Sequence, residues 1–271
     1  MMYRTLPILV VLTYAGAMNA QTEVARKIAV EGLQREANRF VDLAPQVQGK
    51  EILTQTSRPQ PGARPVQRSV VSEYGFLSLQ PGEVREIRQV QSVDGKALKR
   101  KANPLKELML SVMAADDTQR RKLLESFERH GLQGVAADFG PVIQMFAGDK
   151  IQKFDFFYQG MEKVNNVAAA KYRFEQIDGA GGLTIYSNGK PIRQKLQGFV
   201  WVLPENGTPT RIFLDSVFDD GPHKIRDVTG VEYLRSEFEA MLPTIVWHKQ
   251  FRDRIIQVED QFRYSEYHKA Q

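Results

Sequence analysis

Aromatic side chains recur at every second position along several segments in the second half of this chain, and this pattern constrains the fold more than any other feature. The alternating groups are Phe154, Phe156 and Tyr158, then Tyr172 and Phe174, then Phe199 and Trp201. Successive side chains of a β-strand point to opposite faces, so residues two apart share a face. Several such strands joined by tight turns predict one broad antiparallel sheet with a large apolar face.

The first twenty residues have the layout of an export signal. Arg4 precedes a short apolar stretch at 6–14, and the small residues at 15–20 suit signal peptidase. No later stretch approaches the roughly 20 apolar residues of a membrane helix. We therefore expect residues 1–20 to be a cleaved signal peptide, and residues 21–271 to be a periplasmic or extracellular protein without a transmembrane span.

Composition narrows the chemistry of the exported chain. The sequence contains no cysteine, so disulfides, thiol catalysis and lipid attachment through cysteine are excluded. Removing Arg4 leaves 36 basic residues against 32 acidic ones, a mild excess that indicates no specific partner. Basic clusters at 96–106 and 120–122 fit a solvated face, with anionic lipid headgroups as the alternative, and export argues against a nucleic-acid partner.

Periodicity divides the exported chain into three parts. Apolar residues at three- and four-residue spacing predict an amphipathic helix over 22–43, ended by Pro45. Strands follow over 49–58, 66–79 and 84–93, with a hairpin turn at Asp94–Gly95. The segment 103–146 has helical patterns that begin at Asn103, Asp117 and Pro141.

From residue 151 the apolar period changes to two. Strands are predicted over 152–160, 166–177, 182–187, 193–203, 210–218, 228–240, 244–252 and 254–267. The whole is predicted to be a single α+β domain over 21–271, with a helix and strands in 21–95, a helical insert at 103–146 and antiparallel strands at 151–267. The sheet is expected to be large and curled, an open half-barrel covered by helices.

Several segments resemble a set of exported bacterial proteins of unknown function. They are 153–160, 170–175, 198–203 with the following Asn206–Gly207 and Arg211, 242–248, 261–267 and 55–58. Those proteins in turn resemble the periplasmic lipoprotein-carrier (LolA-like) fold, an open half-barrel covered by helices. The resemblance covers most of 21–271 and implies an apolar cavity between sheet and helices, suited to acyl chains or lipidated peptides. It transfers no functional residues, because no ligand-binding motif matches position by position.

Some strands carry bulky apolar groups on both faces. On 210–218, Ile212 and Leu214 face one way, and Phe213 and Val217 face the other. Each such side chain gains roughly 1.5–3 kcal/mol when buried, so a surplus needs a helix, a ligand or a partner as cover. The alternative is that the helices cover the face completely. The residues expected to line an apolar cavity are Phe154, Phe156, Tyr158, Tyr172, Phe174, Phe199, Trp201, Ile212 and Leu214.

Catalytic and metal-binding patterns are weak. The chain has neither a Gly-x-Ser-x-Gly elbow nor a His-Glu-x-x-His helix. The metal candidate is an acid-rich stretch, although part of it also suits a tight turn. Its members are Asp215, Asp219, Asp220, His223 and Asp227. His248 follows Trp247 on a predicted strand and is expected on the surface or in a groove.

These observations favour a non-enzymatic cell-envelope protein that binds a lipid, a lipoprotein or another apolar ligand in a half-barrel cavity, without a cofactor. Two alternatives remain open: an envelope interaction or sensor module with a closed core, and a metal-dependent enzyme that uses the 215–227 stretch. If the first hypothesis holds with the lining residues above, a Trp201→Glu variant weakens lipid binding.

Overall fold

The computed structural model describes residues 9–58, 62–80, 82–98, 132, 139–178, 183–187 and 190–270. Helix α1 spans Leu9–Leu43, and the 3-10 helices are η1 (Ala44–Gln46), η3 (Gly140–Phe146) and η4 (Gly148–Lys153). The strands of the first part are β1 (Val47–Ser57), β2 (Val66–Gln80), β3 (Glu83–Val93) and β4 (Lys96–Ala97). Those of the second part are β5 (Phe154–Val164), β6 (Val167–Gln176), β7 (Leu183–Ser187), β8 (Lys190–Gln194), β9 (Gln197–Val202), β10 (Pro209–Asp220), β11 (His223–Arg235), β12 (Met241–Arg252) and β13 (Ile255–Lys269).

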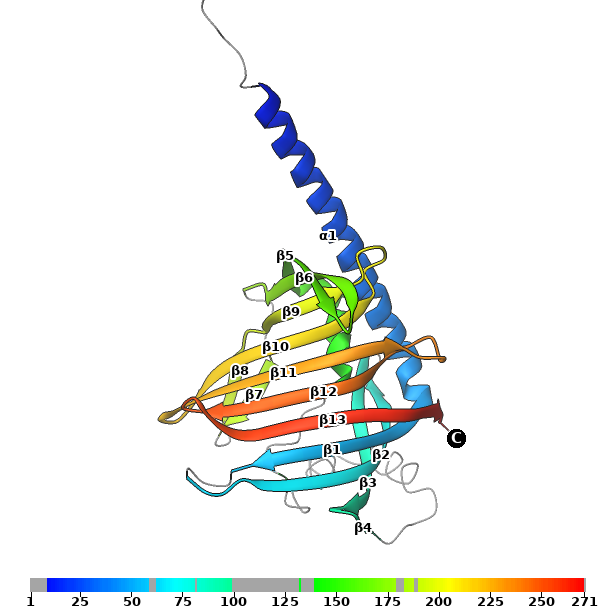
Figure 1. Ribbon diagram of the computed structural model, residues 1–271, viewed down its shortest axis with the longest axis vertical. Helices are drawn as coiled ribbons and strands as arrows, with labels where there is room; N and C mark the ends of the chain where they lie inside the picture. Colours follow the sequence, from blue (N-terminus) through cyan, green and yellow to red (C-terminus); the bar gives the residue numbers. More distant parts are fainter. Residues whose placement is uncertain are drawn as a thin grey trace, which may run out of the picture.

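Eleven of the strands form one antiparallel sheet in the order β4-β3-β2-β1-β13-β12-β11-β10-β9-β6-β5, and β7 and β8 form a separate hairpin. The sheet is open, with β4 and β5 at its two edges. One hydrophobic cluster contains Val84 of β3, near one edge, and Phe154 of β5, at the other, so the sheet bends around a shared core (Figure 1). The predicted fold class, a large curled antiparallel sheet with an N-terminal helix, is confirmed.

Helix α1 packs on the inner face of the sheet along one stripe. Ala29, Leu33, Ala37 and Phe40 are buried, at the spacing that places side chains on one side of a helix. The first half of α1 projects beyond the sheet (Figure 1). Among the described helices, none combines the length and the apolar character needed to cross a membrane.

Two glycines bring α1 against the turn between β9 and β10. A Cβ atom on Gly32 would lie 2.1 Å from the carbonyl oxygen of Asn206 and 2.5 Å from the Cα of Gly207. The guanidinium of Arg35 also donates to the Asn206 carbonyl at 2.8 Å. Backbone therefore meets backbone here, and only glycine at position 32 allows so close an approach.

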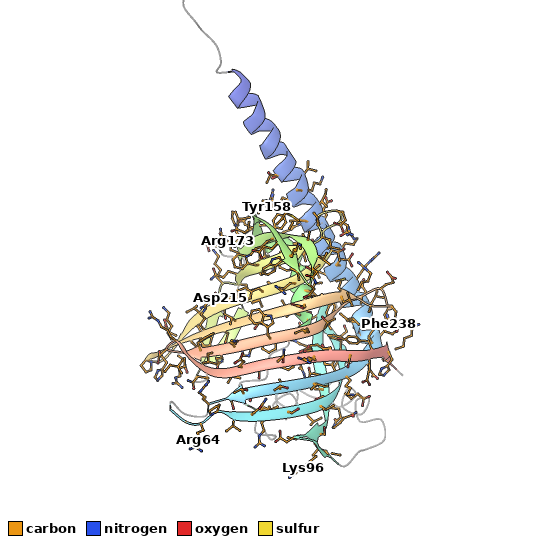
Figure 2. The ribbon with its side chains drawn as sticks, in the orientation of Figure 1. Arg64, Lys96, Tyr158, Arg173, Asp215 and Phe238 are labelled. Atoms are coloured by element: carbon orange, nitrogen blue, oxygen red, sulfur yellow. The ribbon has the colours of Figure 1, made fainter. Side chains whose placement is uncertain are left out.

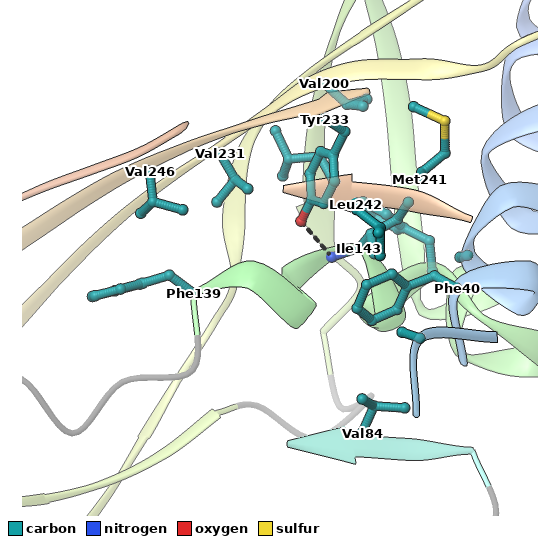
Figure 3. Packing of buried hydrophobic residues seen from close by; sticks show 14 of the residues in the cluster. Phe40, Val84, Phe139, Ile143, Val200, Val231, Tyr233, Met241, Leu242 and Val246 are labelled. Carbon is teal, nitrogen blue, oxygen red and sulfur yellow. Dashed lines mark hydrogen bonds between the residues drawn. The ribbon is translucent and has the colours of Figure 1, made fainter. Parts of the chain in front are cut away.

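Helix η3 fills the space between α1 and the middle of the sheet (Figure 3). The Tyr233 hydroxyl of β11 accepts a hydrogen bond from the Ile143 amide at 3.1 Å and donates one to the Gly140 carbonyl at 2.8 Å. Ile143 and Phe146 are fully buried. The chain thus supplies part of its own lid, as expected for the short helix predicted at Pro141.

Several predicted boundaries differ from the structure. The predicted strand 193–203 is divided between β8 and β9, because Lys195 and Leu196 are not in strand conformation. Strand β11 ends at Arg235 rather than at 240, where a turn closed by the Ser236 amide and the Ala240 carbonyl intervenes. Helix α1 ends at Leu43 as predicted but begins at Leu9, upstream of the predicted signal cleavage. The helices predicted from Asn103 and Asp117 lie outside the described residues, and so does most of both basic clusters.

Candidate ligand-binding groove

An apolar groove lies between α1 and the β5–β6–β9 end of the sheet. Its volume is about 230 Å³. The side chains around it are small or apolar on the helix and aromatic or apolar on the strands (Figure 2 shows Tyr158 beside α1). They belong to Thr22, Ala25, Ala29, Tyr158, Met161, Ala170, Tyr172, Val202 and Pro204.

A β-bulge in β5 gives the groove two of its side chains. Tyr158 pairs with Tyr172 and Gly160 pairs with Lys171, so Gln159 is an extra residue on this strand. Because of the extra residue, Tyr158 and Met161 both face inward although they lie three positions apart. The rings of Tyr158 and Tyr172 lie 5.5 Å apart. The side of the groove formed by β5 and β6 is therefore set by the local irregularity of the edge strand.

The described side chains at the groove leave no unpaired charge beside Tyr172 at neutral pH. Burial raises the pKa of Tyr172, Tyr158 raises it further, and Arg26 lowers it by a smaller amount. Tyr172 is therefore a neutral phenol. Arg26 is held by Glu23, one turn earlier on α1, with a contact of 2.5 Å. Arg26, which lowers the pKa of Tyr172, thus has its own carboxylate partner, and the groove suits an uncharged apolar group.

Most of the residues predicted to line a cavity face inward, but few of them line open space. Phe154, Phe156, Tyr172, Phe174 and Ile212 belong to the main core cluster, and Leu214 packs against it. Of the nine, Tyr158 and Tyr172 line the groove.

Phe199 and Trp201 are a correction to the predicted set. They lie on the outer face, in a separate cluster with Val164 and Ala169. Val200 and Val202 take the inward positions on β9 instead. The error has a physical cause: β9 is apolar on both faces, so its pattern alone cannot tell which pair points inward.

The inner space near β5 and β6 is filled by Phe146 of η3. Its ring lies 5.4 Å from the ring of Phe154, 5.7 Å from that of Phe156 and 5.2 Å from that of Phe174. These are ordinary edge-to-face and tilted aromatic contacts. The aromatic surface that the sequence leaves without an obvious cover is thus partly covered by the protein itself, and open space remains at the α1 end.

Two buried charge clusters on the inner face were not predicted. In the first, Arg88 contacts Glu51 at 2.8 Å and Glu86 at 2.5 Å. Tyr74 donates to Glu86 at 2.6 Å, and the Gly140 amide does so at 3.0 Å. Burial raises the pKa of Glu51 to about 7, because the opposing effect of Arg88 is smaller and Glu86 repels a second charge. This cluster anchors the start of η3.

The second cluster surrounds His248, which was expected on the surface or in a groove and is 3% exposed. Its ring contacts Asp260 at 2.8 Å and Asp227 at 3.5 Å, and Gln55 donates to Asp260 at 2.7 Å. Burial alone would lower the pKa of His248, but the two carboxylates outweigh this and raise the pKa to about 9. The imidazole is therefore a buried cation at neutral pH, held between the two carboxyl groups. The sequence signal for this cluster was the polar residues at alternate positions of β1 and β13. The same alternation is typical of a strand whose polar side faces solvent, so it did not indicate a buried cluster.

The acid-rich stretch does not gather into a metal site. Asp215 pairs with Arg226 at 2.6 Å, His223 with Asp253 at 2.5 Å, and Asp227 lies beside His248. Within the described ranges, no three potential ligand side chains are arranged to hold a metal ion.

Comparisons with known proteins give likenesses of fold only. No family model matches the chain, and no curated protein matches it. An outer membrane lipoprotein-sorting protein domain from Vibrio parahaemolyticus is similar at 9% identity, over 90% of this chain and 93% of that one, with a TM-score of 0.45. A DUF1329 family protein from Desulfovibrio piger is similar at 11% identity, over 89% and 93%, with a TM-score of 0.39.

A LolA superfamily protein from Nitrosomonas europaea is similar at 8% identity, over 90% of this chain and 94% of that one, with a TM-score of 0.37. These structures include the group that the sequence resembles.

Proposed function

We propose that the protein is an exported, non-enzymatic envelope protein that binds one apolar chain in the groove between α1 and the β5–β6–β9 end of the sheet. The observation that carries this proposal is the exposure of Tyr158 and Met161, 45% and 50%, beside apolar groove walls. Large apolar side chains gathered in water at a concave site are typical of a surface that a ligand covers.

The volume limits the ligand. Liquid water takes about 30 Å³ per molecule, and a methylene group is of similar size, so a groove of about 230 Å³ holds roughly eight such groups. This suits the end of a single acyl chain and is too small for several chains side by side. Burying eight methylenes is worth roughly 6 kcal/mol, which before the costs of association corresponds to a Kd of the order of tens of micromolar.

Export is compatible with this site. Among the residues whose side chains the structure describes, those that line the groove lie at or beyond Thr22, so cleavage of the proposed signal after Ala20 would leave them in place. Mass measurement of the protein isolated from cells tests the cleavage directly.

The ligand proposal is tested by titrating the protein with a fluorescently labelled decanoic acid. We expect saturable binding, and a loss of affinity of about tenfold or more in a Tyr158→Asp variant, since a carboxylate would stand in the apolar groove. Phe157→Asp is the matched control, because Phe157 is 40% exposed on the same strand but faces outward, with the guanidinium of Arg173 over its ring. Equal affinities of the two variants, or no saturable binding at all, would rule the groove out.

A second candidate function is the binding of a protein partner at the same end of the sheet. β5 is an edge strand of the sheet. Tyr158 and Met161 on this strand are exposed, and so is Val167, the first residue of β6, at 48%. An exposed apolar edge can accept another strand, whose side chain would then occupy the groove. Native mass spectrometry of protein isolated from its envelope separates the two candidates, since retained lipid favours the first and a retained polypeptide favours the second.

A further inference from the structure

A row of side chains crosses the outer face of the sheet, on the side away from α1. The row consists of residues that are direct partners on neighbouring strands, so they lie side by side across the sheet. In order from β5 to β12 they are Phe157, Arg173, Phe199, Phe213, Gly230 and Trp247. Five strand intervals of about 4.8 Å give the row a length of roughly 24 Å.

Three pairs of side chains in this outer row lie close together. The guanidinium carbon of Arg173 lies 4.5 Å from the ring centroid of Phe157. Phe199 and Phe213 have ring centroids 6.1 Å apart. The rings of Phe213 and Trp247 are 5.5 Å apart although their strands are separated by β11.

Gly230 makes this last contact possible. A Cβ atom at this position would lie 2.2 Å from Cε2 of Trp247, so the indole occupies the space where a side chain would stand. The outer row therefore presents a strip of aromatic rings and one guanidinium, one side chain wide, that crosses six strands and follows the curvature of the sheet.

Charged side chains accompany the strip, and every cation in it has an anion beside it. Lys171 lies 4.7 Å from the Phe199 centroid and 5.1 Å from that of Trp201. The indole of Trp201 donates to Glu162 at 2.9 Å. The ion pairs are Lys171 with Glu162, Arg173 with Glu175, and Arg211 with Glu232.

The balance of charge decides the class of ligand. A polyanion or an anionic membrane needs unpaired cations, whereas these cations are already neutralised. A protein partner needs about 800 Å² on each side, and a strip one ring wide between ion pairs offers much less apolar surface. A sugar ring has an apolar face of C–H bonds that stacks on the negative face of an aromatic ring. Its hydroxyl groups can donate to carboxylates and accept from guanidinium groups, both of which flank the strip.

We propose that the outer row binds a linear, uncharged glycan that lies across the strands. A strip of rings on laterally paired positions of neighbouring strands fits an extended chain of repeating units, and the paired carboxylates and cations supply hydrogen bonds on its sides. The site is separate from the groove, since its side chains point to the opposite face of the sheet.

Isothermal titration with chitohexaose and cellohexaose tests the proposal, with heparin as a polyanionic probe. We expect saturable binding of at least one neutral oligosaccharide and a loss of about tenfold or more in Phe213→Ala and in Trp247→Ala. Val217→Ala is the matched control, because Val217 is on β10 and 45% exposed on the same face but lies beyond the row. Phe157→Ala serves if the central variants fold poorly, because this residue lies at the open edge of the sheet.

Failure of every neutral oligosaccharide to bind the wild-type protein would overturn the proposal. Unchanged oligosaccharide affinity in Phe157→Ala and in whichever of Phe213→Ala and Trp247→Ala folds would also overturn it. So would tighter binding of heparin than of the neutral oligosaccharides. Tyr158→Asp is expected to leave glycan binding intact, so the outcome here and the outcome for the groove are independent.

Discussion

Replacing Gly32 by alanine tests whether α1 is held as closely against the β9–β10 turn as described. The added Cβ would stand 2.1 Å from the Asn206 carbonyl oxygen, where an ordinary contact is at least 3.4 Å, so helix and turn must separate by more than an ångström. Both obstructing groups are backbone and cannot rotate away. Overpacking of this kind costs about 1–3 kcal/mol, whereas alanine gains about 1 kcal/mol over glycine in a helix interior.

Because backbone blocks the new methyl group, we expect the upper part of this range and a net loss of about 2 kcal/mol. In a domain of this size that corresponds to a fall in Tm of roughly 4–8 °C by circular dichroism. Glu31→Ala is the control, since Glu31 is exposed at the preceding position and its ion pair with Lys27 is a long one of 3.8 Å. A Gly32→Ala protein as stable as the wild type, or more stable, would refute the packing of α1 on the turn, because helix propensity would then act unopposed.

Three further outcomes follow from the inner face. Burial raises the pKa of Glu51 to about 7, so its contribution to the unfolding free energy is fully present below about pH 4.5 and is lost as pH rises through 7. Glu51→Gln removes this titration. The unfolding free energy of the variant, measured by urea titration, should therefore depend less on pH between 4.5 and 7. The pKa of His248 is raised to about 9, so its contribution to the unfolding free energy is also lost as pH rises, here between about 6.5 and 9. Nuclear magnetic resonance titration should find the ring still protonated at pH 8. A neutral ring at that pH would contradict the buried ion pairs. Phe146→Ala should cost about 3–5 kcal/mol and open a cavity among the inner rings, so that the labelled fatty acid binds more tightly than to the wild type; an unchanged Tm would show that η3 does not fill this space.

The fold was predictable because its signals are local. Period-two alternation located the strands of the second half, and Asp94 and Gly95 both adopt positive φ, as a tight hairpin turn requires. The spacing of Ala29, Leu33, Ala37 and Phe40 gave the buried stripe of α1. Each of these patterns depends only on neighbours along the chain.

The candidate site was less predictable because it depends on register and on distant partners. The bulge at Gln159, which adds Met161 to the groove, leaves no mark in the apolar pattern of β5. Phe199 and Trp201 alternate correctly but face outward, so the predicted effect of Trp201→Glu on lipid binding no longer follows. Phe146 covers inner aromatic surface from a segment eight residues before β5, and nothing in the strand pattern announces it.

The position of β1 has a consequence for how the protein comes to be made. β1 lies between β2 and β13, and its register with β13 joins Val47 to Lys269 across almost the entire chain. The middle of the sheet therefore cannot close until β13 has been synthesised, because β1 pairs with β13. The exported protein proposed above would gain a delay in folding from this arrangement, and a chain that stops short of β13 would present β1 and β12 as two long, unpaired edges.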